Sequence, residues 1–164
     1  MNEVRLYPDI VKWLKSYLKD RHSHSEIQVY DTHKINLSRF IVDQKLHKFF
    51  SEYNAFEIKV DITAIIRAKK RISLAFVECK VKPITLRDVG QILGYSLVAK
   101  PEYAFIVSPE GISDSLNALF RSFGRYDILE YAPGRKIRIV QWDLTRKEID
   151  SRTLLPPGEF IPSK

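Results

Sequence analysis

The feature that most constrains the fold is a pair of apolar segments, residues 57–66 and 72–81, joined by a short basic connector. The second segment is almost wholly apolar up to Val77, which is typical of a central strand. In the first, apolar and polar residues alternate, and the face expected to be apolar holds Ile58, Val60, Ile62, Ala64 and Ile66. Because the connector is short, we expect the two segments to form an antiparallel β-hairpin.

Periodicity and capping residues predict the other elements. Apolar residues recur at helical spacing up to about Asp20, and Pro8 requires that this helix starts or kinks near it. Thr85 and Asp88 have the spacing of a capping box, which predicts a helix over 85–100. Its expected apolar stripe is Leu86, Val89, Leu93 and Leu97, and Gly90 and Gly94 are expected to let it approach the sheet closely. The remaining expected elements are a strand at 26–31, a helix at 37–50 (a strand near Ile41 and Val42 stays open), a strand at 102–107, a helix at 112–123 and a strand at 136–142.

This order of elements predicts an α/β domain with a central mixed sheet that is flanked by helices. The helix at 85–100 connects the strands at 72–81 and 102–107, so these two strands are expected to be parallel. A chain of 164 residues suits one domain with a real core. We therefore expect residues 1–150 to form a single domain, and the proline-containing residues 151–164 to form an irregular arm.

The charge favours a partner with a phosphate backbone, although many proteins without such a partner are also basic. The formal net charge is +7, and it is uneven. Residues 1–82 hold 16 Lys and Arg against 10 Asp and Glu, whereas residues 83–164 hold 11 against 10. The single cysteine excludes an internal disulfide, and no apolar run suggests a membrane span or a signal peptide. We expect a cytoplasmic protein.

Charged side chains appear at the end of the second apolar segment. Glu78 and Lys80 are two residues apart on the expected strand, so they project from the same side of the sheet. Counting from a connector centre near residue 69 places Asp61 opposite about residues 77–78. Two carboxylates suit Mg²⁺ or Mn²⁺, and a nearby lysine can orient a water or stabilise charge on the phosphate. The residues leave open the alternative of a structural ion pair with Asp61 in solvent.

Asp61 followed by Glu78-Cys79-Lys80 resembles the motif of the PD-(D/E)XK nuclease superfamily, whose fold is restriction-endonuclease-like. The resemblance covers roughly residues 3–107 and implies the α-β-β-β-α-β core of that superfamily. It also implies that Asp61 and Glu78 bind the metal, that the Cys79 backbone carbonyl is a further ligand, and that Lys80 serves the attacking water.

Further positions carry the same resemblance. Val60 occupies the proline position of the motif, which varies in the superfamily. Gln91 and Tyr95 are four residues apart on one face of the expected helix, and they look like the glutamine-tyrosine motif of RecB-like members. The resemblance implies that Gln91 helps to position the site and that Tyr95 lies near DNA. It also implies that Glu3 joins the metal site directly or through water, while a solvated N-terminal residue is the alternative.

Other basic residues are candidates for contacts with phosphates. Those near the hairpin are Lys69, Lys70, Arg71 and Lys82, although a solvated hairpin tip is the alternative for the first three. Those later in the chain are Arg121, Arg125, Arg135 and Arg138. The histidines at 22, 24, 33 and 47 lack metal-ligand spacing and are expected at the surface.

The sequence thus predicts a Mg²⁺- or Mn²⁺-dependent nuclease that hydrolyses DNA phosphodiester bonds, as an endonuclease. RNA as substrate, exonuclease rather than endonuclease action, and a mechanism with one or two metals stay open. A homodimer is the simple way to cut both strands of a duplex. The alternatives are a catalytically inactive module that binds nucleic acid on the same fold, and an interaction protein without a nucleic-acid partner.

Overall fold

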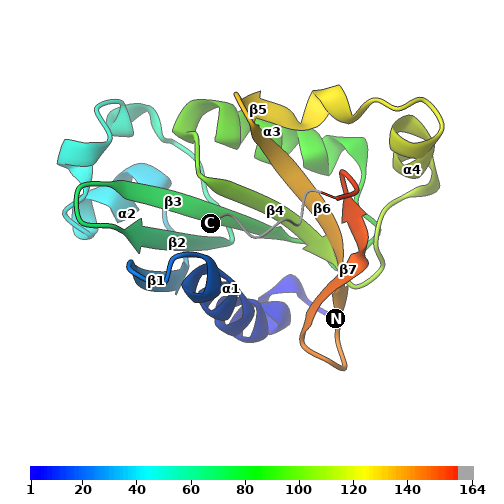
Figure 1. Ribbon diagram of the computed structural model, residues 1–164, viewed down its shortest axis with the longest axis horizontal. Coiled ribbons are helices and arrows are strands. Elements are labelled where there is room, and N and C mark those ends of the chain that lie inside the picture. The colour runs from blue at the N-terminus through cyan, green and yellow to red at the C-terminus, as the bar shows by residue number, and fades with distance from the viewer. Residues whose placement is uncertain (159–164) are drawn as a thin grey trace.

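The predicted hairpin lies at the centre of a mixed seven-stranded sheet in a computed structural model that describes residues 1–158 (Figure 1). The strands lie in the order β1-β2-β3-β4-β6-β5, and β7 pairs with β6. Their bounds are β1 (Glu26–Asp31), β2 (Ile62–Arg67), β3 (Ile72–Cys79), β4 (Tyr103–Ser108), β5 (Glu130–Ala132), β6 (Arg135–Asp143) and β7 (Glu148–Leu155). β2 and β3 pair antiparallel and β3 and β4 pair parallel, as predicted.

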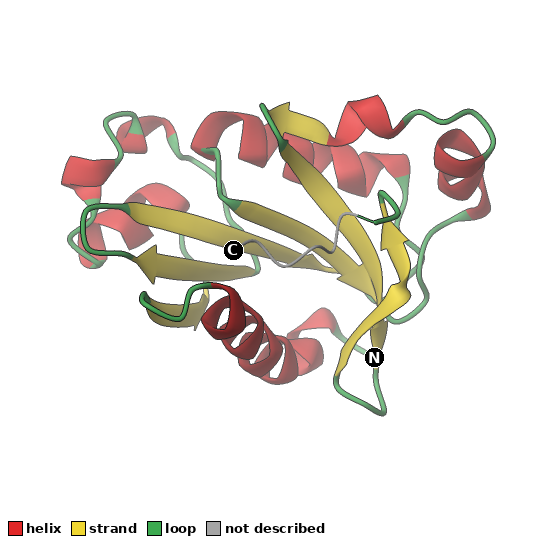
Figure 2. Cartoon of the chain, in the orientation of Figure 1, coloured by secondary structure: helices red, strands yellow, loops and turns green. Residues whose placement is uncertain are grey.

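Helices cover both faces of this sheet (Figure 2). One face packs against α1 (Tyr7–Arg21), whose Ile10 and Leu14 are fully buried with Val77 and Phe105. The other face packs against α2 (Leu37–Asp43), α3 (Leu86–Ala99) and α4 (Asp114–Arg121). Short 3-10 helices are η1 (Glu3–Leu6), η2 (His47–Phe49), η3 (Tyr53–Ala55) and η4 (Tyr126–Leu129). The predicted α/β class, a mixed sheet flanked by helices, is confirmed.

The first helix starts where its proline allows. Pro8 lies in the first turn of α1, where its missing N–H has no helical acceptor to lose. The preceding residues continue the chain as η1, which Asn2 caps by accepting a hydrogen bond from the Val4 N–H. The prediction that the helix starts or kinks near Pro8 is therefore confirmed, and Glu3 lies in an ordered turn.

The first segment of the hairpin is shorter than predicted, because β2 begins at Ile62 rather than near residue 57. Upstream, the carbonyls of Phe56 and Ile58 accept hydrogen bonds from the first N–H groups of α2. The expected single apolar face is confirmed for Ile62, Ala64 and Ile66, which share one core cluster, but it does not include Val60. Val60 packs with α2, whereas Ile62 packs with α1. Thr63, expected on a polar face, is fully buried.

The helix predicted at 37–50 ends at Asp43. Lys45 adopts a left-handed conformation with φ of 59°, and the Leu46 N–H closes back onto the Ile41 carbonyl. This turn ends the helix because a non-glycine residue in that conformation cannot continue it. The apolar residues up to Phe49 then form only the short η2.

The face of α3 differs from the predicted stripe of Leu86, Val89, Leu93 and Leu97. Its buried residues are Val89, Ile92, Ser96 and Ala99, whereas Leu86 and Leu97 are exposed. Gly90 and Gly94, expected to approach the sheet, face open space. The small residues on the buried face are instead a serine and an alanine.

The C-terminal region contains more sheet than predicted. The strand expected at 136–142 is confirmed as β6, but β5 and β7 were not predicted. The irregular arm expected at 151–164 is wrong over residues 151–155, which complete β7 and bury Leu154 and Leu155. Residues 159–164 of that arm lie outside the described residues. Within residues 1–158, no helix is both long and apolar enough to cross a membrane.

We expect Thr85→Ala to lower the free energy of unfolding by about 1 kcal/mol. Thr85 caps α3, with its side chain accepting from the Asp88 N–H while the Asp88 carboxylate accepts from the Thr85 N–H. Urea denaturation would measure the loss, with Ser16→Ala on the exposed face of α1 as a control. Equal losses in both variants would contradict a specific role of this cap.

Candidate active site

The register of the hairpin brings Asp61 and Glu78 together. Ile62 pairs with Val77, so the next position outward sets Asp61 opposite Glu78, as the count from the connector predicted. The Asp61 N–H donates to Oε1 of Glu78 over 3.2 Å. The Cys79 N–H donates to Oδ2 of Asp61 over 2.8 Å. Asp61 is therefore held by the backbone of the neighbouring strand and is not a solvated carboxylate.

The backbone of Cys79 faces the same carboxylate. In a strand, the N–H and C=O of one residue point to the same side, and those of the next residue point to the other. The Lys80 N–H donates to the Val107 carbonyl on β4, whereas the Cys79 N–H donates to Asp61. The Cys79 carbonyl therefore points toward the Asp61 side, while its thiol is buried in the core beneath α1.

Glu78 is a buried carboxylate beside a second one. Its side chain is 4% exposed. Burial, and then the charge of Asp61, raise the pKa of Glu78 from 4.5 to about 8, while Lys80 opposes the shift. Ionising both carboxyl groups therefore needs a further positive charge, which a bound cation would supply.

Lys80 lies just beyond the end of β3, and its ammonium is 3.9 Å from Oδ1 of Asp88. The pKa values of Glu78 and Glu3 are both raised by burial, and the positive charge of Lys80 opposes each rise. The three side chains therefore interact electrostatically. Asp88 thus has two roles, since it completes the capping box of α3 and pairs with the lysine. The sequence assigned it only the first.

Glu3, near the N-terminus, lies close to Lys80 and Asp88. It lies on η1 and lines a cavity together with Lys80, Lys82, Thr85 and Asp88. Burial raises the pKa of Glu3; Lys80 lowers it, and the charges of Asp61 and Asp88 raise it further. The alternative of a solvated N-terminal residue is wrong, because the side chain is half-buried within the electrostatic range of the other acids.

The sequence did not predict that Tyr7 contacts Asp61. Its hydroxyl donates to Oδ1 of Asp61 over 2.8 Å, although the two residues are 54 positions apart. The ring is 3% exposed, and burial followed by this hydrogen bond raises the pKa of Tyr7. Tyr7 lies one helical turn after Glu3, and this spacing is the only sequence signal that could have drawn attention to it.

The donor set fits a hard divalent cation. Two carboxylates, Asp61 and Glu78, and a backbone carbonyl at Cys79 are all oxygen ligands, which Mg²⁺ and Mn²⁺ prefer. Mg²⁺ keeps several of its waters, so a protein can hold it with one or two carboxylates. Within residues 1–158, no group of three or more His, Cys, Asp or Glu side chains could hold a metal. The protein ligands of such an ion would therefore be few.

Gln91 and Tyr95 are not joined to this cluster by a hydrogen bond. The Gln91 amide instead donates to the Tyr95 hydroxyl over 2.9 Å, so the two side chains share a face of α3, as expected. Gln91 is exposed, and Tyr95 packs against the core beneath α2.

The predicted basic contacts fall in two places. Lys82 is exposed on the rim of the cavity beside Lys80. The connector residues Lys69, Lys70 and Arg71 are exposed at the opposite end of the hairpin. β3 spans eight residues, so they lie roughly 23 Å from the carboxylates. The structure thus separates the connector from the candidate site.

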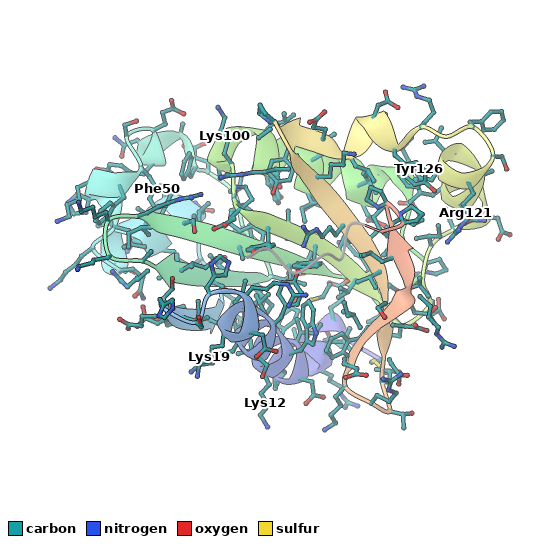
Figure 3. The ribbon with its side chains drawn as sticks, viewed as in Figure 1. Lys12, Lys19, Phe50, Lys100, Arg121 and Tyr126 are labelled. Carbon is teal, nitrogen blue, oxygen red and sulfur yellow. The ribbon has the colours of Figure 1, made fainter. Side chains whose placement is uncertain are left out.

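The later arginines also lie apart from the carboxylates. Arg138 points into the molecule, donates to the Tyr17 hydroxyl over 2.8 Å and lies over the rings of Tyr103 and Phe105. Arg135 donates to the Lys100 carbonyl. Arg121 and Arg125 bond their own neighbours, Asn117 and Asp127. Figure 3 shows Arg121 on α4, at the far side of the molecule from α1.

Two of the histidines are not simple surface residues. His22 is half-buried, and its Nε2 lies 2.9 Å from the Tyr103 hydroxyl. His33 is half-buried and bonds Asp31, and its ring centroid is 5.1 Å from that of Tyr7. Both were expected at the surface, and both lie there only in part, because each packs against an aromatic ring.

Comparison with known proteins found no matching family model, no similar curated protein and no similar solved structure.

Proposed function

We propose that this chain is a Mg²⁺-dependent nuclease of the PD-(D/E)XK type, with a restriction-endonuclease-like core, that hydrolyses phosphodiester bonds within DNA. The observation that supports this most is the meeting of Asp61 and Glu78 across the hairpin with Lys80 beside them. A cation would favour the ionised form of this buried pair, and Lys80 interacts electrostatically with Glu78.

Asp61, Glu78 and the Cys79 carbonyl would hold the ion. Bound there, Mg²⁺ polarises a phosphate oxygen and lowers the pKa of a coordinated water. The chain supplies the geometry. Asp61 is fixed at both oxygens by Tyr7 and Cys79, and Glu78 is oriented by the Asp61 N–H. Fixed ligands reduce the reorganisation that binding a cation would otherwise require.

Lys80 orients the attacking water and stabilises negative charge that develops on the phosphate. Its pairing with Asp88 is 3.9 Å long and only partly buried, so a phosphate can replace the carboxylate at little cost. Glu3 faces the cavity next to Lys80, where it can accept a proton or bind a metal-coordinated water. Lys82, on the rim, supports the phosphate backbone.

We expect Lys80→Met to reduce nicking of supercoiled plasmid in Mg²⁺ by about 10²–10³-fold, because it removes the charge and keeps an unbranched side chain of similar size. A closed circle has no ends, so nicking also tests endonuclease action. Lys12→Met is the matched control, since Lys12 is exposed on the outer side of α1 (Figure 3). Equal rates in the wild type and in Lys80→Met would overturn the proposal.

The alternative of an inactive binding module predicts a different pair of results. Such a protein would bind plasmid in a salt-dependent way and would leave it intact with Mg²⁺ or Mn²⁺. Filter binding at several salt concentrations, run beside the nicking assay, separates the two functions. Absent or salt-insensitive binding would favour an interaction protein without a nucleic-acid partner.

A further inference from the structure

We infer that Tyr7 is a positioning residue for Asp61, and that its hydroxyl sets the orientation in which this carboxylate binds a divalent cation. The inference rests on the proposed function. It starts from one contact, the 2.8 Å hydrogen bond from the Tyr7 hydroxyl to Oδ1 of Asp61. The bond links α1 with the first position before β2, two elements far apart in the chain.

The carboxylate of Asp61 is fixed at both oxygens by donors from different elements. Tyr7 on α1 donates to Oδ1, and the Cys79 N–H on β3 donates to Oδ2. One hydrogen bond leaves a carboxylate free to turn about its Cβ–Cγ bond, whereas two from separate directions fix its plane. An ionised carboxylate can accept about four hydrogen bonds in total, so acceptor sites remain on both oxygens for a cation.

The hydroxyl itself has little freedom. The Tyr7 ring is 3% exposed in the core formed by α1 and the sheet, and the His33 ring packs against it at 5.1 Å. A group that positions a metal ligand must be more rigid than the ligand, and a buried ring meets this requirement. An exposed serine or lysine at the same distance would not.

Tyr7 also connects Asp61, a proposed metal ligand, with the N-terminal segment that carries Glu3. Glu3 and Tyr7 are four residues apart across the junction of η1 and α1. Glu3 is within electrostatic range of Lys80 and Asp61, and Tyr7 bonds Asp61 directly. The hydrogen bond therefore holds the N-terminal segment in the place from which Glu3 reaches the cavity.

We expect Tyr7→Phe to weaken Mn²⁺ binding about 10–100-fold, the usual effect of removing a group that orients a metal ligand. The variant keeps the ring and its packing. Isothermal titration with Mn²⁺ and no DNA measures binding directly, and plasmid nicking over a range of Mn²⁺ concentrations accompanies it. At saturating Mn²⁺ the nicking rate should return to within a few-fold of the wild type. A cooperative urea transition without metal would show that the variant is folded.

Tyr103→Phe is the matched control, because its hydroxyl bonds His22 at the other end of the sheet and lies in the same core. It should bind Mn²⁺ as the wild type does. The inference fails if Tyr7→Phe binds Mn²⁺ normally while the wild type cuts DNA and Asp61→Asn does not. If the wild type neither binds Mn²⁺ nor cuts, the proposed function fails and this inference fails with it.

Discussion

Replacing Asp61 by Asn should reduce plasmid cleavage by about 10³-fold or more, the largest effect expected of any single substitution in this chain. A metal ligand contributes several kcal/mol through charge stabilisation in the transition state, and each 1.36 kcal/mol is tenfold in rate. Asn keeps the shape of the side chain but removes the charge to which the Tyr7 hydroxyl and the Cys79 N–H donate. Initial nicking rates at saturating Mg²⁺ would measure the loss.

Glu78→Gln should show a similar loss of cleavage without loss of fold. The amide oxygen can still accept the Asp61 N–H, and the variant has no carboxyl group whose ionisation is opposed by burial. Its thermal unfolding without metal should therefore occur at the same or a higher temperature than in the wild type. Cleavage by either variant at the wild-type rate, with a normal unfolding transition, would exclude this pair of carboxylates as the metal site.

The second large effect concerns pH. Without metal, the wild type should lose unfolding free energy as the pH rises from about 5 to 8, by up to about 1.4 kcal/mol per pH unit. The pKa of Glu78 is about 8 in the folded protein and 4.5 ordinarily. Between these values the folded state holds a proton that the unfolded state has released, so stability is greatest below about pH 4.5 and falls as the pH rises toward the folded-state pKa. Urea denaturation at four pH values would measure the slope.

Glu78→Gln provides the control, because it differs from the wild type only in this carboxyl group. The difference between the two slopes therefore belongs to Glu78. A divalent cation should remove that difference, since it favours the ionised carboxylate and releases the proton. Parallel stability profiles of the two proteins without metal would show that Glu78 is ionised throughout, contrary to its burial.

Local rules predicted the elements that hold the site. Alternation and a short connector predicted the hairpin, and counting residues across it set Asp61 opposite Glu78. Thr85 and Asp88 predicted the start of α3 through a hydrogen-bonding pattern that lies within four residues. These features succeed because they depend on neighbours in sequence, or on a loop too short to allow another register.

Features that depend on how helices and strands pack against one another could not be predicted from local sequence rules. Two faces of α3 carry apolar residues at helical spacing, and only packing on the sheet selected Ile92 and Ala99 over Leu86 and Leu97. The strand β7 pairs with β6 and was not recognised, because its polar and apolar residues do not alternate cleanly. Burial of Thr63 likewise follows from the helices that cover both sides of β2.

The sequence by itself determined the hairpin, the relative order of Asp61, Glu78 and Lys80, and a charge suited to phosphates. The tertiary structure alone decided what surrounds them. It brought the Tyr7 hydroxyl to Asp61, Glu3 into the cavity of Lys80, and Asp88 to the ammonium. These contacts join residues from separate elements, and their geometry depends on how α1 and α3 pack on the sheet, which no spacing within one segment encodes.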